Sequence, residues 1–345
     1  MVKTVNPVCI TLESSLYQRT DLTVGVSRLL LLGTDAEVLM KKPSGKLVFP
    51  HEIEMPQERP NASVLPRSTL WKADYGDWHG DGYAAELCVS PFNCIDQGMS
   101  HIGRTMDWLR RRVKYTLEMP VIYSVPDDVV QSAPEQVRML GCMPSFSVYN
   151  EEANPSALGE TERTTGFHMH MSDPWLDSEK ADRVIRWADI YCGALWTLVA
   201  PTDPKIEARR RQCYGRAGEH RKNIYPNGVF GFEYRVLPGT VLSHPIYISM
   251  MFNLFRHAFH AAFRGEAPEE MTKMARIAIN EADRVVALEL LKQLPVTEPS
   301  QHLLQGLVAN TPTPLSTQDL INNLTACQGH RKFMTGQTSY TLIPR

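Results

Sequence analysis

Four segments of the chain alternate strictly between apolar and polar residues, and this alternation constrains the fold more than any other feature. The clearest is GVFGFEYRVLPG at 228–239, in which aromatic or aliphatic residues alternate with Gly231, Glu233 and Arg235. Similar alternation occurs at 34–41, 84–90 and 166–172. Because successive side chains of a strand point to opposite faces, each segment predicts a strand with an apolar face and a polar face.

The polar faces of these strands carry ionisable groups, mostly at i and i+2. They are Asp35 and Glu37, His168 and His170, Glu233 and Arg235, and Glu86 with Cys88. If helices cover the apolar faces of a shared sheet, these groups converge on one concave surface. Withdrawing such charges from water is costly unless partners compensate, and crowded carboxylates raise each other's pKa. Divalent cations resolve both problems. Carboxylate oxygens suit Mg²⁺ or Mn²⁺, and imidazole is a more common ligand of Mn²⁺ than of Mg²⁺.

Two other interpretations of these residues stay open. An antiparallel sheet often has one solvated face, on which alternating polar residues carry no chemistry. A zinc hydrolase built on His168 and His170 is a further alternative, although no HExxH motif accompanies them.

A basic segment at 205–222 precedes the strand of Glu233 and Arg235. Its cations are Lys205, Arg209, Arg210, Arg211, Arg216, Arg221 and Lys222, against Glu207 and Glu219. Two glycines in its YGRAGEHR core suit a loop that approaches a ligand closely. Several arginines beside a metal–carboxylate cluster predict a polyphosphate ligand, without a Walker A motif or a GxGxxG after a strand. A solvated basic helix, or a weak nucleic-acid patch, is the alternative.

Net charge, hydropathy and cysteine pattern exclude several classes of function. The formal net charge of −2 gives no reason to expect nucleic-acid or membrane binding, and no apolar run approaches the roughly 20 residues of a membrane span. The N-terminus lacks the apolar stretch of a secretory signal. The seven cysteines are scattered and form no Cys-x-x-Cys. This pattern predicts reduced thiols in a cytoplasm rather than disulfides or a structural zinc site.

The order of the expected elements predicts an α+β fold with a largely antiparallel sheet, because long helices interrupt the strands irregularly. Helices are expected at 99–119, at 178–200 with Ser178 as N-cap, and through 245–310. Residues 26–41 predict two strands divided by Gly33, followed by a short strand from 47 and a loop at 55–68. The prediction is one catalytic domain, 1–345, with an arm at 1–25, a sheet core with the site at 26–240, a helical part at 241–310 and a tail at 311–345.

Five motifs occur in an order that resembles a known family. They are LGTDAEVLM, GDGYAAELCVSP, TTGFHMHMSD, RRQCYGRAG and FGFEYRVL, spanning about residues 30–240. Together they resemble the phage-type carboxylate–amine ligases, or amidoligases, of the glutamine synthetase superfamily. The resemblance implies a glutamine-synthetase-like fold, in which a curved, mainly antiparallel sheet forms a funnel with helices on its outer side. It also implies ATP, two or three Mg²⁺ or Mn²⁺ ions, and a cytoplasmic location, in the host cytoplasm if the protein is phage-encoded.

The resemblance further implies roles for individual residues. Metal ligands would be Glu37, Glu86, His168 or His170, and Glu233. Groups at the ATP phosphates or the transferred phosphoryl group would be Arg210, Arg211, Arg216, Arg221 and Arg235, with His170 as a further cofactor contact. The expected catalytic residues are Glu233, Arg235, Arg221 and Arg216, and Asp35 is a candidate base. Two departures from the family pattern, Gly166-Phe167 before the histidines and Glu219-His220 before Arg221, could alter substrate choice.

The expected reaction is ATP-dependent amide formation. ATP would convert the carboxylate of a small molecule or peptide to an acyl phosphate, which an amine then attacks. One alternative is a guanidino kinase or glutamate–cysteine ligase-like enzyme of the same fold. Another is a non-catalytic phage virion or scaffold protein on a ligase-derived fold, since fold alone does not prove activity.

Overall fold

The computed structural model describes residues 30–57, 71–138, 145–153, 161–225, 228–294, 306, 308–309 and 311–326. The expected arm at 1–25, most of the loop at 55–68 and the tail beyond residue 326 lie outside these residues. The described residues form an α+β fold around a mainly antiparallel sheet, as the order of elements predicts. None of their helices is both long enough and apolar enough to cross a membrane.

One large sheet organises the described part of the chain. Its strands follow the order β3-β4-β5-β1-β11-β13-β12-β8-β9, with β2 and β6 paired to β1. The bounds are β1 (Leu31–Lys41), β2 (Leu47–Val48), β3 (Trp71–Ala73), β4 (Gly76–Asp81), β5 (Ala84–Val89), β6 (Thr116–Glu118), β8 (Phe146–Ser147), β9 (Asn150–Ala153), β11 (Phe167–Ser172), β12 (Glu219–Ile224) and β13 (Phe230–Tyr234). A separate pair consists of β7 (Ile122–Ser124) and β10 (Glu162–Thr164). The spatial order differs from the chain order, so the sheet joins segments that are distant in sequence.

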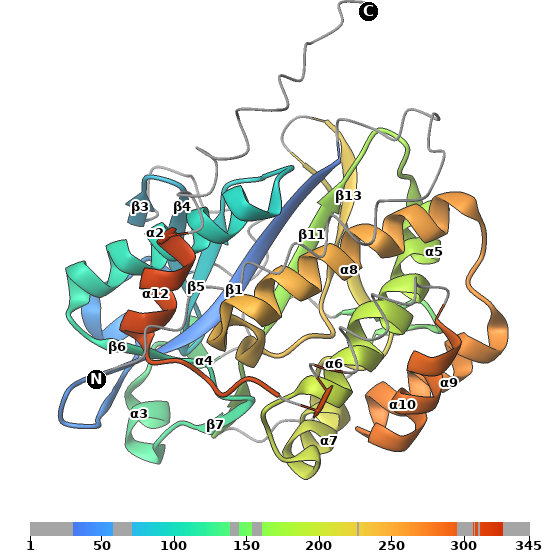
Figure 1. The fold of residues 1–345 in the computed structure, drawn as a ribbon. Helices are drawn as coiled ribbons and strands as arrows, with labels where there is room; N and C mark the ends of the chain where they lie inside the picture. The colour runs from blue at the N-terminus through green and yellow to red at the C-terminus, as the bar shows by residue number, and fades with distance from the viewer. Residues whose placement is uncertain are drawn as a thin grey trace, which may run out of the picture.

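Long helices lie across one face of this sheet. The described helices are α2 (Ile95–Val113), α3 (Asp127–Ser132), α4 (Glu135–Arg138), α5 (Ser178–Ala188), α6 (Ala194–Val199), α7 (Pro204–Cys213), α8 (Pro245–Arg264), α9 (Glu269–Asn280), α10 (Arg284–Gln293) and α12 (Thr317–Ala326). Short 3-10 helices are η1 (Pro50–Ile53) and η3 (Gly239–Ser243), and η2 (Asp189–Gly193) is a π-helix. Figure 1 shows α2, α8 and α5 lying across the sheet, and α2 packs on β4 and β5 while α5 packs on β12 and β13.

The apolar faces of the central strands form the core beneath these helices. Val38, Leu87, Met169 and Phe232, one from each of four strands, are fully buried at 0% exposure. Phe252 of α8 packs against this layer, with its ring centroid 5.8 Å from that of Phe167. Each such side chain contributes about 1.5–3 kcal/mol of burial free energy. The apolar half of the alternating pattern therefore fixes which face of each strand is turned toward the helices, and the polar half is directed to the other side.

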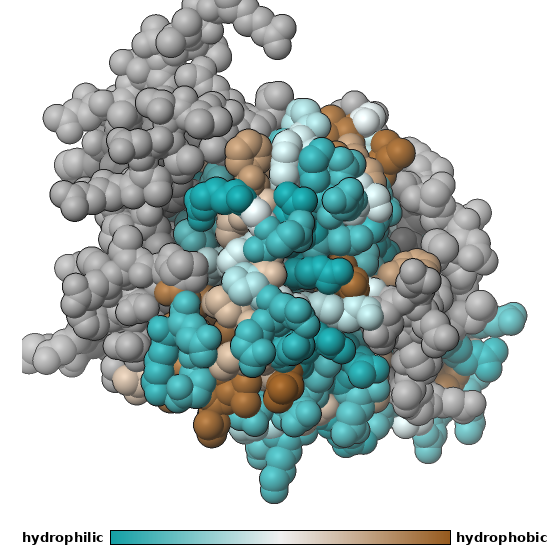
Figure 2. All heavy atoms as spheres, turned by 90° about the vertical axis from the view of Figure 1, so that its right-hand side faces the viewer, coloured by the Kyte–Doolittle hydropathy of each residue, from teal (hydrophilic) through white to brown (hydrophobic). Residues whose placement is uncertain are grey.

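The surface seen from the right-hand side of Figure 1 is mainly hydrophilic among the described residues (Figure 2). Large apolar side chains are exposed at a few positions on α9 and α10, namely Ile277, Val285 and Leu288. Such scattered exposure is normal for a folded domain.

Two boundaries predicted in the first third of the chain are wrong. Gly33 does not divide two strands, because β1 runs unbroken from Leu31 to Lys41 and Gly33 pairs directly with His170 of β11. The helix predicted at 99–119 is α2, which begins at Ile95 and ends at Val113. Lys114 then adopts a positive φ of 58°, and residues 116–118 form strand β6 instead of a further turn of helix.

The helix predicted at 178–200 is interrupted by the π-helix η2. Its N-cap is Asp177, whose carboxylate accepts the Lys180 N–H at 2.9 Å, and not Ser178. The wider turn carries Asp189, which is fully buried and accepts hydrogen bonds from the hydroxyls of Tyr149 at 2.8 Å and Tyr234 at 2.7 Å. This short π-helix therefore links the helical layer to the site strand β13.

The basic segment is ordered secondary structure on both sides of a tight turn. Helix α7 ends at Cys213, Gly215 and Gly218 adopt φ values of +75° and +76°, and β12 begins at Glu219. Both glycines are needed because the left-handed region is unfavourable for other residues. Strand β12 was missed in the sequence because its polar residues conceal the alternation.

The predicted tail includes a docked helix. Residues 317–326 form α12, which packs on α2 (Figure 1) and buries Leu320, Ile321 and Leu324. Gly103 of α2 permits this contact, since a Cβ atom there would lie 2.6 Å from the Leu324 Cβ. The three apolar residues have helical spacing, but the many polar residues around them concealed this helix in the sequence.

Candidate functional site

The strand order places the predicted polar groups on adjacent strands. β5, β1, β11, β13 and β12 are consecutive neighbours in the sheet. In their register, Glu37 lies opposite Glu86, Asp35 opposite His168, and Glu233 opposite both His170 and Arg221. Directly opposite side chains of an antiparallel pair share one face, with Cβ atoms about 4.5–5.5 Å apart. The polar halves of the alternating segments therefore meet on one surface.

Asp35 is the centre of a histidine pair. Its Oδ1 lies 3.0 Å from Nδ1 of His168, and its Oδ2 lies 2.9 Å from Nε2 of His170. Tyrosine hydroxyls contact the outer ring nitrogens, Tyr214 at 2.9 Å from His168 and Tyr225 at 2.7 Å from His170. Burial raises the pKa of Asp35, but the neighbouring imidazoles, His170 more than His168, outweigh burial and hold this pKa well below its usual value.

The two imidazoles respond differently to their surroundings. Burial lowers the pKa of His168 and the charge of Arg235 lowers it further, so Asp35 does not restore it. Burial also disfavours the charged form of His170, but the attraction of Asp35 and Glu233 prevails and raises the pKa of His170. Of the two imidazoles, His170 is therefore the more readily protonated.

Glu233 lies between a histidine and two arginines. Its Oε1 is 3.2 Å from Nδ1 of His168 and contacts Nη1 of Arg235, and its Oε2 lies 3.8 Å from Nη1 of Arg221. Burial raises the pKa of Glu233, but the nearby guanidinium charges outweigh burial and lower it. The side chain of Arg235 is 1% exposed and that of Arg221 is 22% exposed. A ligand can therefore reach Arg221 far more easily than Arg235.

A second group of carboxylates lies on β1, β4 and β5. One oxygen from each of Glu37, Asp81 and Glu86 lies within 4.8 Å of the other two. Glu37 also accepts the N–H of Gly166 at 2.7 Å. Burial and the charge of Asp81 raise the pKa of Glu37 to about 8. A carboxyl group whose ionised form is disfavoured by burial and by a neighbouring acid gains from a bound cation, which offsets both effects.

The chemistry of the donors fits divalent cations. A second set of converging donors consists of Asp35, His170 and Glu233, again within 4.8 Å of one another. Carboxylates alone suit Mg²⁺, and carboxylates with an imidazole suit Mn²⁺ as well. The predicted ligand His168 lies beside this set, with Nδ1 within 3.2 Å of carboxylate oxygens of Asp35 and Glu233 and Nε2 at 2.9 Å from the Tyr214 hydroxyl. The converging imidazole is that of His170, which was predicted as the alternative metal ligand to His168 and as a cofactor contact.

Two of the predicted phosphate-binding arginines contact the backbone instead. Arg210 donates to the carbonyl oxygens of Val236 at 2.8 Å and Leu237 at 3.1 Å, and Arg211 donates to those of Gly215 at 2.6 Å and Val236. Both side chains are buried, so they hold the chain that follows β13 and are not presented to a ligand. The remaining candidate, Arg216, is exposed in the turn between α7 and β12.

Strand β4 supplies residues that the sequence interpretation missed. Asp77, His79 and Asp81 alternate along it, and His79 lies directly opposite Glu86. The signal was present as Asp-x-His-x-Asp, the same i, i+2 spacing as in the other strands. Two glycines in the segment obscured its strand character. Tyr214 and Tyr225 were also missed, because nothing in the sequence indicates that they lie beside the histidines.

Neither models of known protein families nor curated protein sequences give a match to this chain. The resemblance to amidoligases therefore depends on the five sequence motifs alone.

Proposed function

We propose that this protein is an ATP- and divalent-metal-dependent ligase that joins a carboxylate to an amine through an acyl-phosphate intermediate. The observation that carries the proposal is the convergence of Glu37, Glu86, His170 and Glu233 on one sheet face, with Arg221 beside them. Carboxylates that need a cation and an accessible guanidinium are the groups that bind a metal–polyphosphate. The glutamine-synthetase-like funnel and the location in the cytoplasm are parts of the same proposal.

The solvent exposure of each site residue indicates its role in the proposed reaction. Bound Mg²⁺ or Mn²⁺ would neutralise charge on the phosphates during phosphoryl transfer. Arg221 is the accessible guanidinium, and we assign it to the phosphate oxygens. Arg235 is buried against Glu233 and holds this carboxylate in its ionised, metal-binding form. Asp35 has a lowered pKa and is therefore a weak base, better suited to orient the two imidazoles than to accept a proton.

The test is ADP release with ATP and Mg²⁺ or Mn²⁺ across a panel of amino acids and peptides, with products identified by mass spectrometry. The proposal expects an amide together with ADP and phosphate. Glu233→Gln should keep the fold and abolish substrate-dependent ADP release. Glu179→Gln is the matched control, because its side chain is 88% exposed on α5, in the helical layer. Wild-type turnover in Glu233→Gln would remove this residue from the site.

The products also separate the competing functions. A phosphoguanidine in place of an amide would identify a guanidino kinase. A γ-glutamyl-cysteine-type product would place the enzyme with glutamate–cysteine ligases. Absence of turnover, together with no metal-dependent increase in melting temperature on addition of ATP, would favour a non-catalytic scaffold.

A further inference from the structure

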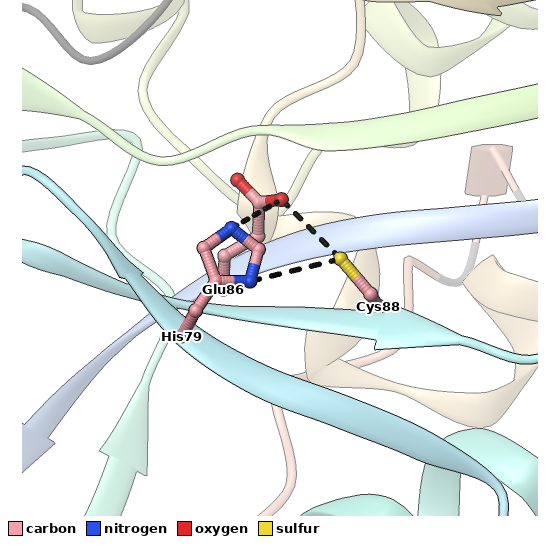
Figure 3. Close-up of side chains that lie close together, drawn as sticks. All are labelled: His79, Glu86 and Cys88. Carbon is pink, nitrogen blue, oxygen red and sulfur yellow. Dashed lines mark hydrogen bonds and ion pairs between the residues drawn. The ribbon is translucent and has the colours of Figure 1, made fainter. Parts of the chain in front are cut away.

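Three different donor types meet at the β4–β5 border of the polar face. His79 of β4 lies opposite Glu86 of β5, and Cys88 is two residues further along the same face (Figure 3). His79 Nε2 is 3.4 Å from Glu86 Oε1, Cys88 Sγ is 3.5 Å from the same oxygen, and Cys88 Sγ is 3.9 Å from His79 Nδ1. His79 and Glu86 are 7% and 6% exposed, and Cys88 is half-buried. An imidazole, a carboxylate and a thiol are thus held together with little solvent.

The spacing of these donors fits a tetrahedral metal centre. In zinc sites the metal lies about 2.3 Å from sulfur and about 2.0–2.2 Å from nitrogen or oxygen. For tetrahedral angles, these bond lengths place donor atoms about 3.4–3.6 Å apart. The Sγ–Oε1 and Nε2–Oε1 separations fall in that range, and Cys88 Sγ lies 3.9 Å from the other ring nitrogen of His79, Nδ1. One donor atom from each residue lies within 4.8 Å of the other two.

The contacts of His79 taken alone resemble a thiol–imidazole–carboxylate relay, because Cys88 lies at Nδ1 and Glu86 at Nε2. In such a relay the thiol and the carboxylate do not touch each other. Here Cys88 Sγ contacts Glu86 Oε1 at 3.5 Å, so the thiol and the carboxylate lie side by side. This direct contact favours a metal shared by the three groups over a relay.

We propose that His79, Glu86 and Cys88 form a binding site for a borderline-soft divalent metal of the Zn²⁺ class. This site prefers a different metal from the carboxylate groups beside it. Thiolate and imidazole select such metals, whereas Mg²⁺ takes oxygen ligands. On binding, the S–H bond of Cys88 breaks, the sulfur–metal bond forms and one proton is released to solvent. Three protein ligands leave a fourth position open, as in zinc sites that bind water or substrate.

Glu86 connects this site to the rest of the polar face. It belongs also to the carboxylate group with Glu37 and Asp81, so its two oxygens can serve neighbouring ions. The inference stands apart from the ligase proposal, since it requires only that the thiol, imidazole and carboxylate bind one metal. Loss of amide formation in Glu233→Gln and loss of metal in Cys88→Ser are separate outcomes.

The test uses Co²⁺ as a spectroscopic substitute for Zn²⁺ in the full chain. Co²⁺ bound to a thiolate gives an intense sulfur-to-metal charge-transfer absorption. We expect one equivalent of Co²⁺ to produce this absorption in the wild type. Stoichiometric Zn²⁺ should displace Co²⁺ and abolish the absorption, whereas excess Mg²⁺ should leave the absorption unchanged. Cys88→Ser and His79→Gln should lose the absorption, whereas Cys94→Ser should retain it. Cys94 is the matched control because it is a free thiol of similar exposure at the start of α2.

A measurement on the wild type avoids any dependence on variant folding. Zn²⁺ should slow alkylation of Cys88 by iodoacetamide at least tenfold, with Cys94 as internal reference and modified peptides quantified by mass spectrometry. Mg²⁺ at the same concentration should have no effect. Equal protection of both cysteines, no protection of Cys88, or a charge-transfer absorption that persists in Cys88→Ser would overturn the proposal.

Discussion

The buried carboxyl group of Asp189 should give the folded protein a distinctive dependence on pH. Burial raises the pKa of Asp189 from 3.8 to about 6, although the hydroxyls of Tyr234 and Tyr149 donate to it and oppose this rise. At about 1.4 kcal/mol per pH unit, this difference corresponds to about 3 kcal/mol. Because the pKa is higher in the folded state, the contribution to stability is fully present below pH 3.8. It is lost as the pH rises through about 6.

Urea unfolding of the wild type and Asp189→Asn between pH 4 and pH 8 measures this effect. Asparagine keeps the shape of the side chain but does not titrate. The free energy of unfolding of the wild type, relative to the variant, should fall by about 3 kcal/mol across this range. Tyr149→Phe serves as a directional control. It removes a donor that favours the ionised carboxylate, so it should steepen the dependence. Parallel curves for wild type and Asp189→Asn would refute the reasoning.

Three further substitutions test the site and its supports. Arg235→Lys should keep more ADP release than Arg235→Ala in the same assay, because lysine retains the positive charge that keeps Glu233 ionised. Equal loss of activity in the two variants would contradict the assigned role. Arg210→Met should lower the free energy of unfolding by about 3 kcal/mol, because two carbonyl oxygens lose a charged donor, whereas nucleotide affinity measured by calorimetry should not change. Gly166→Ala should lower the affinity for Mn²⁺ measured by equilibrium dialysis. The added methyl group would overlap the His168 imidazole and displace it from the site. An unchanged Mn²⁺ affinity would count against a place for His168 beside the metal ligands.

Much of the site could be predicted from single strands. Alternation determines which face each residue takes, because the strand period is two regardless of neighbours. Glu37, Glu86, His170 and Glu233 were therefore assigned to the polar face correctly before their partners were known. The roles of Arg210 and Arg211 could not be read in this way. Both lie in a basic segment typical of phosphate binding, and only the packing of α7 against the chain after β13 directs them to carbonyl oxygens.

The sequence by itself determined that this chain has amphipathic strands with ionisable groups on one face, since alternation and residue type are local properties. The tertiary structure decided which strands are neighbours. It therefore decided that His170 converges with Asp35 and Glu233, that β4 adds His79 and Asp81, and that α12 docks on α2. The physical reason is that pairing order and helix docking depend on the burial of apolar faces distant in sequence, which no local pattern encodes.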